Sequence, residues 1–277
     1  HNVRSDTHSQ QIEVNGNFKE AFRYGWGGGV SPGILDRTKG FVAGHLIPFV
    51  LRRADKVKLV HSRQLDPLHL NFKAKTSVFP NFVPILCFSE VKHSDGGFIL
   101  LLGYPWYLKG VDVLIKAFNL ISDDFPGYRL KIVGWCPEGR HYFEALARPN
   151  PRIELCEPVF YDKVIELMSN CSLYVLASRT DSSPRVLREA MACRKPIVAS
   201  NIEGIPDLIK DGQTGLLFRS ESVDDLAAKM RLILTNRELS ETLAENGYKF
   251  VHEYLSEARY IMQYRRMIDE VLQAESR

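Results

Sequence analysis

Two carboxylates are the residues of this sequence whose types and spacing best suit chemistry. Asp181 and Glu189 stand eight positions apart, the first in a predicted loop and the second on the predicted helix "PRVLREAMACR". Carboxylates accept hydrogen bonds from sugar and ribose hydroxyls, often two at a time. The pair therefore predicts a crevice for a polyhydroxylated ligand. The plainer alternative, a turn-capping aspartate and an exposed helical glutamate, stays open at this point.

The helix that carries Glu189 is predicted to begin at a ligand-binding edge. Ser182 or Ser183 is the predicted N-cap, and Pro184 suits the first helical position. Arg185 lies in the first turn, where a cation is unfavourable beside the helix dipole unless an anion is present. Because the free N–H groups of a helix start bind diphosphates, an anionic ligand is expected here.

The elements that position these residues alternate along the chain from Gly97 onward. Short apolar runs separated by helical patterns predict βαβ units, and continuous apolar strands indicate a parallel, doubly wound α/β sheet with helices on both faces. Ligands of such Rossmann-like sheets bind beyond the carboxyl ends of the strands. The predicted strands cover 98–104, 129–135, 152–158, 172–178, 196–200 and 215–218, and the helices 110–125, 141–148, 161–170, 184–194, 222–235, 238–254 and 257–274.

Composition places the chain among globular proteins of one large or two smaller domains. It has 277 residues, 45% of them hydrophobic and 25% charged. No apolar run approaches the roughly 18 to 20 residues of a membrane-spanning helix. Five cysteines without metal-ligand spacing indicate a reduced, intracellular chain. No nucleic-acid partner is expected.

The first third of the chain is its basic part. Residues 1–95 contain 13 Lys and Arg against 8 Asp and Glu, although the net charge of the whole chain is only +3. Basic residues beside apolar ones favour an anionic membrane surface, so peripheral contact with a membrane is a hypothesis. The alternative is an ordinary solvated helix end.

Four stretches, in one order, carry a resemblance to a known family. They are "LLGYPWYLKGVDVLIKAF" (101–118), "RLKIVGW" (129–135), "SSPRVLREAMACRKPIVAS" (182–200) with the aspartate before it, and "EGIPDLIKDGQTGLLF" (203–218). In these the sequence resembles the retaining glycosyltransferases of family 4, also called glycosyl transferases group 1. The resemblance implies a GT-B-like fold, in which two Rossmann-like domains hold a nucleotide-sugar between them.

The resemblance also implies a division of the chain. Residues 1–95 would be a partial N-terminal, acceptor-side domain whose beginning is missing, and residues 96–235 the C-terminal nucleotide-sugar-binding domain. Residues 236–277 would be C-terminal helices that pack back on the domains.

Individual roles follow from the matching positions. Glu189 would hold the donor ribose, Asp181 the transferred sugar, and Lys109 the donor diphosphate, whose charge grows as the sugar leaves. These three are the predicted catalytic residues. The full set predicted to bind the donor is Gly103, Tyr104, Lys109, Gly110, Asp181, Ser182, Ser183, Pro184, Arg185, Val186 and Glu189.

The sequence departs from the family pattern at several positions. Tyr104 stands where the family has an arginine on the diphosphate, so we expect Arg185 or Arg179 to supply that charge. Asp181 is one methylene shorter than the family's glutamate, and Arg194 replaces a common glycine. His1 is a further candidate, for the histidine that lies near the transferred sugar in the family.

These observations predict a hexosyltransferase. It would move a sugar from a UDP- or GDP-sugar to a hydroxyl of a glycan or lipid-linked acceptor, with retention of anomeric configuration. No cofactor and no metal ion are expected, since the sequence has no Asp-x-Asp pair. The expected location is cytoplasmic, including the inner face of the membrane. The alternatives are a non-catalytic nucleotide-sugar-binding module and a nucleotide-sugar epimerase of the same fold.

Overall fold

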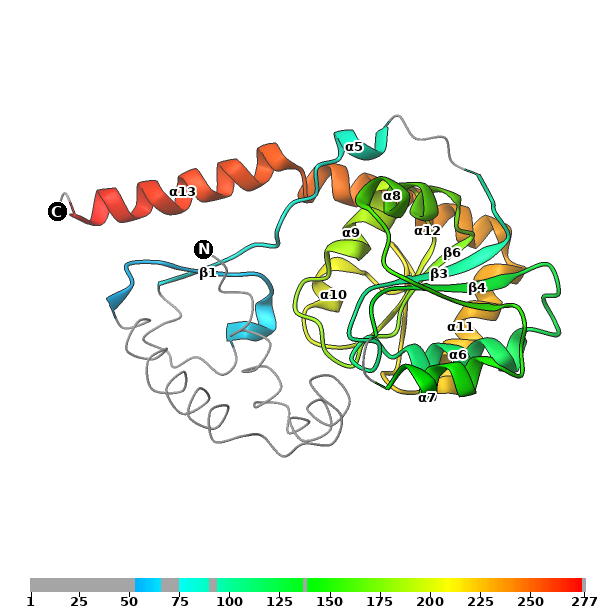
Figure 1. Ribbon diagram of the computed structural model, residues 1–277. Helices are drawn as coiled ribbons and strands as arrows, with labels where there is room; N and C mark the ends of the chain where they lie inside the picture. The colour runs from blue at the N-terminus through cyan, green and yellow to red at the C-terminus, as the bar shows by residue number, and fades with distance from the viewer. Residues whose placement is uncertain (1–52, 66–74, 90–93, 137–138, 276–277) are drawn as a thin grey trace, which may run out of the picture.

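A six-stranded parallel sheet organises most of the chain (Figure 1). The computed structural model describes residues 53–65, 75–89, 94–136 and 139–275. The strands lie in the order β5-β4-β3-β6-β7-β8, so the order reverses between β3 and β6. The strands are β3 (Phe98–Leu102), β4 (Arg129–Val133), β5 (Ile153–Cys156), β6 (Leu173–Leu176), β7 (Ile197–Ser200) and β8 (Leu216–Phe218).

Helices cover both faces of this sheet, which confirms the predicted α/β fold class. One core lies under α6, α7 and α11, and the other lies under α8, α9 and α10. Every side chain of β3, "FILLL", is buried, as its continuous apolar run predicts. The helices are α6 (Val111–Ile121), α7 (Arg140–Ala147), α8 (Tyr161–Asn170), α9 (Arg185–Ala192), α10 (Ile205–Leu208), α11 (Val223–Thr235) and α12 (Arg237–Tyr254).

Four of the six predicted strands are slightly too long at their carboxyl ends. The strand predicted over 98–104 ends at Leu102, because Gly103 adopts a φ of 137° and turns the chain out of the sheet. The remaining residues of that prediction form the loop that leads into α6. Because the strand ends earlier, the loop that follows it is longer. This loop lies at the carboxyl edge of the sheet, where ligands of this fold class bind.

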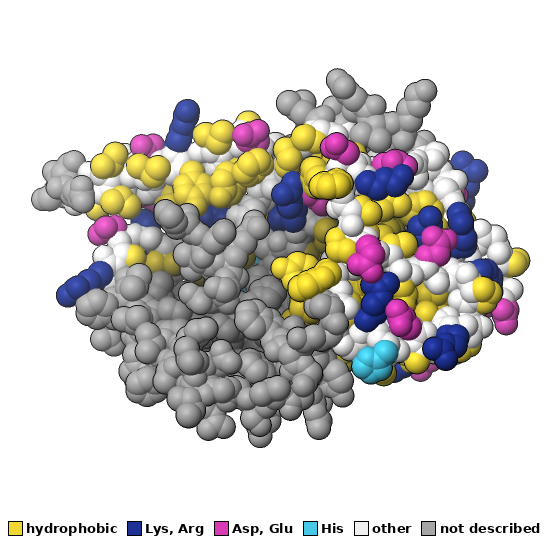
Figure 2. Space-filling view, viewed as in Figure 1, with side chains coloured by type: hydrophobic (Ala, Val, Ile, Leu, Met, Phe, Trp, Pro, Cys, Tyr) yellow, Lys and Arg dark blue, Asp and Glu magenta, His cyan; other side chains and the backbone are white. Residues whose placement is uncertain are grey.

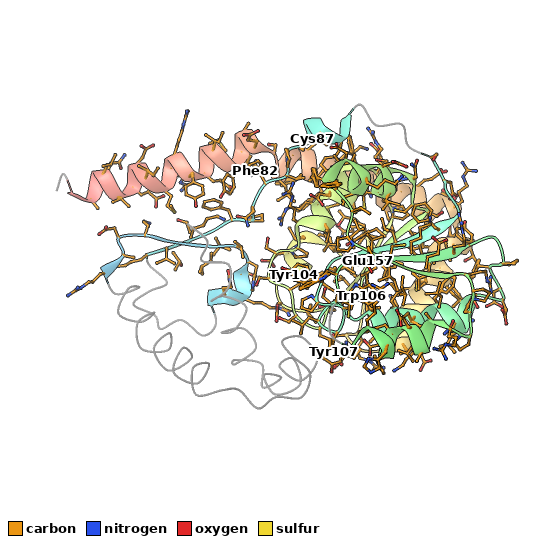
Figure 3. All side chains as sticks on the ribbon, in the orientation of Figure 1. Phe82, Cys87, Tyr104, Trp106, Tyr107 and Glu157 are labelled. Carbon is orange, nitrogen blue, oxygen red and sulfur yellow. The ribbon has the colours of Figure 1, made fainter. Side chains whose placement is uncertain are left out.

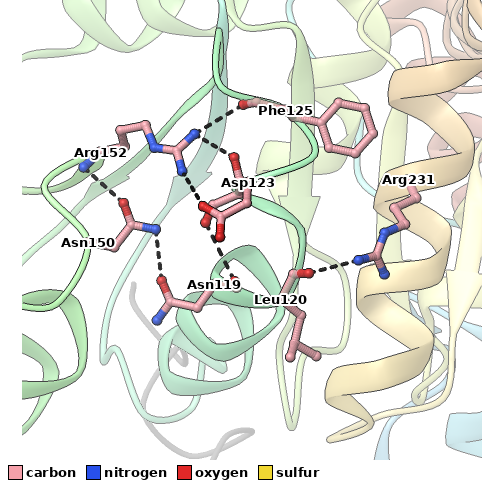
Figure 4. Close-up of polar contacts among 8 residues, drawn as sticks. Asn119, Leu120, Asp123, Phe125, Asn150, Arg152 and Arg231 are labelled. Carbon is pink, nitrogen blue, oxygen red and sulfur yellow. Dashed lines mark hydrogen bonds and ion pairs between the residues drawn. The ribbon is translucent and has the colours of Figure 1, made fainter.

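Polar contacts fasten the far end of α6 (Figure 4). The guanidinium of Arg152 donates to the carbonyl oxygens of Ser122 and Phe125, at 2.5 and 3.3 Å. Arg231 of α11 donates to the carbonyl oxygen of Leu120 at 2.7 Å. These bonds satisfy carbonyl groups that a helix end leaves without intrahelical partners. With its C-terminal end fixed, α6 holds its opposite end, beside Lys109, in place.

The N-terminal part described forms a small parallel pair of strands, and the last helix lies against it. Val57 of β1 is in register with Thr76 of β2. Phe79 contacts the ring of Tyr260 edge-on, at 5.7 Å between centroids. Figure 1 shows the last helix extending from the sheet-bearing part towards β1. These elements are β1 (Val57–Leu59), η1 (Ser62–Leu65), β2 (Thr76–Val78), α5 (Leu86–Ser89) and α13 (Glu257–Glu275).

The helix α13 has an inner side that contacts the strand pair and an outer side at the surface. On the inner side, Nζ of Lys56 lies 2.7 Å from Oε2 of Glu270. Figure 2 shows hydrophobic side chains along the outer surface of the helix. The exposed apolar residues of α13 are Ile261, Met262, Ile268 and Leu272. The ion pair and the ring contacts thus fix one side of α13 to the strand pair.

Lys58 joins β1 to α13 through its ammonium group. Its Nζ donates to Oδ1 of Asn81 at 2.6 Å and lies 5.0 and 5.1 Å from the ring centroids of Phe79 and Tyr260. Burial, together with the positive charge of Arg188, lowers the pKa of Lys58 to about 8. The ammonium is therefore held by rings and one amide, in surroundings that favour its neutral form.

This lowered pKa predicts how stability depends on pH. The unfolded lysine keeps its proton up to its ordinary pKa of 10.5, whereas the folded one loses it near pH 8. Because the unfolded state then binds more protons, the free energy of unfolding should rise between about pH 8 and 10.5. Urea unfolding at a series of pH values measures this free energy. We expect it to rise over this pH range in the wild type relative to Lys58→Met, and parallel plots of the free energy of unfolding against pH for the two proteins would contradict the prediction.

Candidate functional site

The candidate site lies at the carboxyl edge of the sheet, where β3 and β6 are neighbours. Gly110 begins α6 with a φ of 64°, and a Cβ there would stand 2.0 Å from the carbonyl oxygen of Ala177. The backbone N–H of Arg179 donates to the carbonyl oxygen of Leu108 at 2.8 Å. These contacts bring the loop after β3 against the loop after β6. Parallel sheets bind ligands at such a reversal of strand order.

Lys109 and Asp181 meet across these two loops. Nζ of Lys109 lies 2.5 Å from Oδ2 of Asp181, and their side chains are 16% and 9% exposed. The backbone N–H of Asp181 donates to Oε2 of Glu203 at 2.9 Å, which fixes the loop that carries the carboxylate. A lysine has three N–H donors, and this pair uses one of them. The structure thus brings two of the predicted residues together, with donors of Lys109 left for a ligand.

The start of α9 differs from the prediction. Pro184, rather than Ser182 or Ser183, is the N-cap residue, and no side chain caps the helix. The hydroxyl of Ser183 instead accepts a hydrogen bond from Arg188 at 2.8 Å. The first N–H groups of α9 therefore have no side-chain acceptor. That arrangement suits an anion, which would satisfy those groups and gain from the helix dipole.

Glu189 is held in one orientation by two neighbours. Its Oε1 lies 2.6 Å from Nε of Arg185 and accepts a hydrogen bond from the hydroxyl of Tyr161 at 2.8 Å. Arg185 also donates to that hydroxyl at 2.8 Å, which closes a three-membered network. Burial and the charge of Glu189 raise the pKa of Tyr161 to about 12, so Tyr161 remains a hydrogen-bond donor.

The second oxygen of Glu189 remains for a ligand. The residue is only 2% exposed, yet its Oε2 accepts no hydrogen bond from the described residues and keeps contact with solvent. A carboxylate with one oxygen fixed by the protein and the other open is suited to receive a hydroxyl pair in a defined geometry. This open oxygen gives a reason why a helix that buries Leu187, Ala190 and Met191 in the core also carries a carboxylate.

Arg179 is held by other residues. Its guanidinium donates to both carboxylate oxygens of Asp112, at 2.8 and 2.9 Å, and to Oε1 of Glu221 at 2.8 Å. A bidentate pair of this kind is strong and geometrically fixed. Arg179 therefore ties the loop after β6 to α6. The other arginine expected to replace the charge missing at Tyr104, Arg185, is the first residue of α9 and pairs with Glu189.

Gly103 lies beside Lys109, and Tyr104 follows it in the chain. Tyr104, labelled in Figure 3, is 61% exposed. Its ring meets that of Trp135 edge-on at 6.2 Å between centroids. A Cβ on Gly103 would stand 3.2 Å from Cε of Lys109, so this glycine lets the backbone pass close to the lysine stem. Val186 is half-buried and packs on the core beneath α9. His1 lies outside the described residues and stays a prediction.

Sequence reasoning missed three residues of this region. Tyr161 begins α8, after β5, and reaches Glu189 from there. Glu203 accepts bonds from the backbone of Asp181 and from the hydroxyl of Thr180. Arg188 is buried beside Ser183. A signal existed for Tyr161 and Glu203, because each follows a predicted strand, and the loops after parallel strands lie at the carboxyl edge of the sheet.

Metal-binding clusters and membrane-spanning helices are both absent from the part of the chain that the structure describes. Within 53–65, 75–89, 94–136 and 139–275, no three His, Cys, Asp or Glu side chains gather in a way that would hold a metal ion. Over the same ranges, no helix combines the length and the apolar character needed to cross a lipid bilayer.

Comparisons with known proteins agree on one family. A sequence model of the family described as "Glycosyl transferases group 1" matches residues 87–250. An uncharacterised glycosyltransferase of Methanocaldococcus jannaschii is 30% identical over 233 residues, which are 82% of this chain and 63% of that protein. The N-acetyl-alpha-D-glucosaminyl L-malate synthase of Bacillus anthracis is 31% identical over 60% of this chain and 43% of its own length. This chain therefore spans less than two thirds of the length of these relatives.

Solved structures share the fold. The HepE protein of Anabaena, determined with UDP and glucose, superposes with a TM-score of 0.68 at 20% identity, over 94% of this chain and 75% of that one. A sucrose-phosphate synthase of Thermosynechococcus elongatus gives a TM-score of 0.73 at 20% identity, over 84% and 62%. These likenesses agree with the GT-B-like α/β fold expected from the sequence.

Proposed function

The chain belongs to the glycosyl transferases group 1 family, and we propose that it transfers a hexosyl group from a nucleoside diphosphate sugar to an acceptor hydroxyl. One observation carries the proposal. Lys109, Asp181 and the uncapped start of α9 surround one end of the sheet, with Oε2 of Glu189 open beside them. A cation, free N–H groups and two carboxylates are the groups that a diphosphate, a ribose and a sugar require.

Each residue has a proposed role in binding the donor. Lys109 and the first N–H groups of α9, with Arg185, take the diphosphate. Glu189 receives the ribose hydroxyls on Oε2, and Asp181 positions the transferred sugar. As the sugar–phosphate bond breaks, negative charge grows on the leaving diphosphate, and fixed positive groups stabilise it without reorganisation. In this proposal Lys109 and the helix start supply the positive charge, so the reaction needs no metal ion.

We propose retention of anomeric configuration for the same site. Asp181 and Glu203 are both engaged by protein donors in the described structure, and one oxygen of Glu189 is as well. Carboxylates held in this way suit the binding of a donor more than the removal of a proton from an acceptor. The leaving phosphate would then accept the proton of the acceptor hydroxyl. The acceptor oxygen would bond to the anomeric carbon on the same face of the sugar that the phosphate leaves, which retains the configuration.

The names of relatives suggest classes of donor and acceptor. A Campylobacter jejuni relative, 33% identical over 111 residues, is named as an N-acetylgalactosaminyltransferase that acts on a diphospho-undecaprenol-linked sugar. The HepE structures contain UDP or UDP-glucose. We propose a UDP- or GDP-sugar as donor and a glycan or lipid-linked sugar as acceptor, with peripheral contact at the inner membrane face for a lipid-linked one.

A second candidate function rests on Tyr104. Tyr104 is exposed and stands at the position where a second cation on the diphosphate was expected, which lowers the positive charge of the site. A chain with too little charge for transfer can still bind a nucleotide-sugar. Turnover with a donor and an acceptor extract favours the transferase, whereas tight donor binding without turnover favours a binding module.

A thermal-shift screen of UDP, GDP and ADP, and of their sugars, tests the proposal. A ligand at a hundred times its Kd adds about 2.7 kcal/mol to the free energy of unfolding. We expect one nucleobase series to raise the Tm by roughly 5 °C on this basis. Calorimetry of the selected nucleotide gives its Kd. If a well-folded sample binds none of the three series, the proposal fails.

A further inference from the structure

Arg188 is a buried guanidinium with no role in the donor contacts proposed above. It is 2% exposed, although arginine is rarely buried without a partner. Its Nη1 donates to Oγ of Ser183 at 2.8 Å and lies 3.4 Å from the carbonyl oxygen of the same residue. Since Ser183 precedes α9, the side chain of Arg188 points back along the helix towards its N-terminus. The guanidinium therefore lies at the ligand-binding edge of the sheet.

The charge of Arg188 is not balanced by a close carboxylate. Among the described residues none forms an ion pair with it, and its Nε is buried without any hydrogen-bond partner. Burial lowers the pKa of Arg188 to about 10, although the charges of Glu189 and Asp181 act in the opposite direction. A buried cation held by one serine is costly, and proteins retain such groups when another species supplies the missing partner.

One neighbouring feature is positive as well. The first turn of α9, next to Ser183, has no side-chain cap, so no side chain accepts a hydrogen bond from its first N–H groups. The buried guanidinium of Arg188 and the start of α9 thus direct positive charge to one region. A negatively charged group is the partner that would satisfy both.

We propose that Arg188 is an anion-binding residue, whose guanidinium takes a phosphate or carboxylate group of a substrate at the N-terminus of α9. This inference rests on the proposed function, because it adds a residue to the same site. Two sources offer that chemistry, namely the diphosphate of the donor and an anionic group of the acceptor. In either case Nη2 of Arg188 donates to the oxyanion, and the bond from Nη1 to Ser183 keeps the guanidinium aimed at it.

A structural role for Arg188 predicts different behaviour. If the arginine serves to hold Ser183, its removal costs stability and leaves anion binding unchanged. If it serves a ligand, an apolar side chain of similar length is tolerated, because replacing a buried unpaired charge by packed methylene groups is often neutral or stabilising. Met is the suitable replacement, since it is flexible and fills irregular space. Removing Arg188 therefore lowers stability but not anion affinity if its role is structural, and lowers anion affinity but not stability if it binds a ligand.

The experiment compares wild type, Arg188→Met and Arg188→Lys. Calorimetry with inorganic pyrophosphate, inorganic phosphate and UDP gives the Kd values, and thermal unfolding gives the Tm. The control is Arg237→Met, which removes an exposed arginine of α12 that pairs with Glu241 at 2.6 Å. We expect Arg188→Met to keep the wild-type Tm or exceed it, and to weaken the binding of at least one probe tenfold or more, with a smaller loss in Arg188→Lys.

The probe that changes identifies the source of the anion. Weaker pyrophosphate and UDP binding assigns Arg188 to the donor diphosphate, whereas weaker phosphate binding with unchanged UDP assigns it to an acceptor group. Kd values within twofold of wild type for all probes in either folded variant would overturn the proposal, as would a wild type that binds none of them. Loss of folding in Arg188→Met, with wild-type Kd values in Arg188→Lys, also counts against it. The proposed function is tested separately, through Glu189.

Discussion

Replacing Glu189 with Gln is expected to weaken the binding of the preferred nucleoside diphosphate about 30- to 100-fold. The physical reason is the loss of a charged acceptor for ribose hydroxyls, since a hydrogen bond to a charged group contributes about 1.5 to 3 kcal/mol. Glutamine keeps the shape of the side chain, and its carbonyl oxygen can still accept from Tyr161, which donates to Oε1 at 2.8 Å in the wild type. Calorimetric titration of the nucleotide measures the change.

The matched control for this substitution is Glu245→Gln. Glu245 also pairs with an arginine, since its Oε2 lies 3.1 Å from Nε of Arg194. Arg194 follows the C-terminal end of α9, however, away from the helix start that the donor would meet. We expect Glu245→Gln to bind nucleotide as the wild type does. A nucleotide Kd that is unchanged in Glu189→Gln would contradict the proposed role of Glu189.

Lys109→Met is expected to lower kcat/KM for transfer about 100- to 1,000-fold. This is the usual loss when one preorganised group that stabilises developing charge is removed. Lys109 stands 2.5 Å from Asp181, so its ammonium is already in place before a ligand binds. The binding of UDP should weaken as well, whereas the binding of uridine, which has no phosphate, should change little. If only UDP binding weakens, the substitution has removed the charge that binds the phosphates. If uridine binding weakens equally, the substitution has damaged the whole pocket.

Lys116→Met serves as the control, on the helix α6 that follows Lys109. Lys116 is exposed on α6, seven positions beyond Lys109, so it carries the same charge without facing the edge. We expect its kinetic constants and Kd values to match those of the wild type. An equal effect of both substitutions would assign the change to net charge and would remove Lys109 from the site.

The order of elements was predictable because it depends on local patterns. The apolar run "FILLL" became the buried strand β3, and the helical spacing in 161–170 matches α8 residue for residue. The carboxyl edge followed from this order, since parallel strands end on one side. Asp181 and Lys109 meet there as the resemblance implied, although they are 72 residues apart. Local periodicity together with parallel topology was enough to predict the edge of the sheet, whereas Lys109 was singled out there by the resemblance.

The partners of the site residues were less predictable, because they come from contacts distant in sequence. Glu189 accepts from Tyr161, 28 positions earlier, and nothing in the helical pattern of α8 marks that tyrosine. Glu203 reaches Asp181 from a left-handed backbone conformation, with a φ of 35°. The serines before α9 looked like caps, yet Ser183 binds Arg188 instead. Which polar group a serine meets is decided by packing, and its local sequence does not contain that information.

A crystal structure of the chain with its preferred nucleoside diphosphate tests the central claim most directly. The diphosphate is expected within hydrogen-bonding distance of Nζ of Lys109 and of the first N–H groups of α9, with the ribose hydroxyls on Oε2 of Glu189. Those contacts would place the donor at the carboxyl edge between β3 and β6. A nucleotide bound elsewhere on the chain, with Glu189 and Lys109 free of it, would contradict the claim.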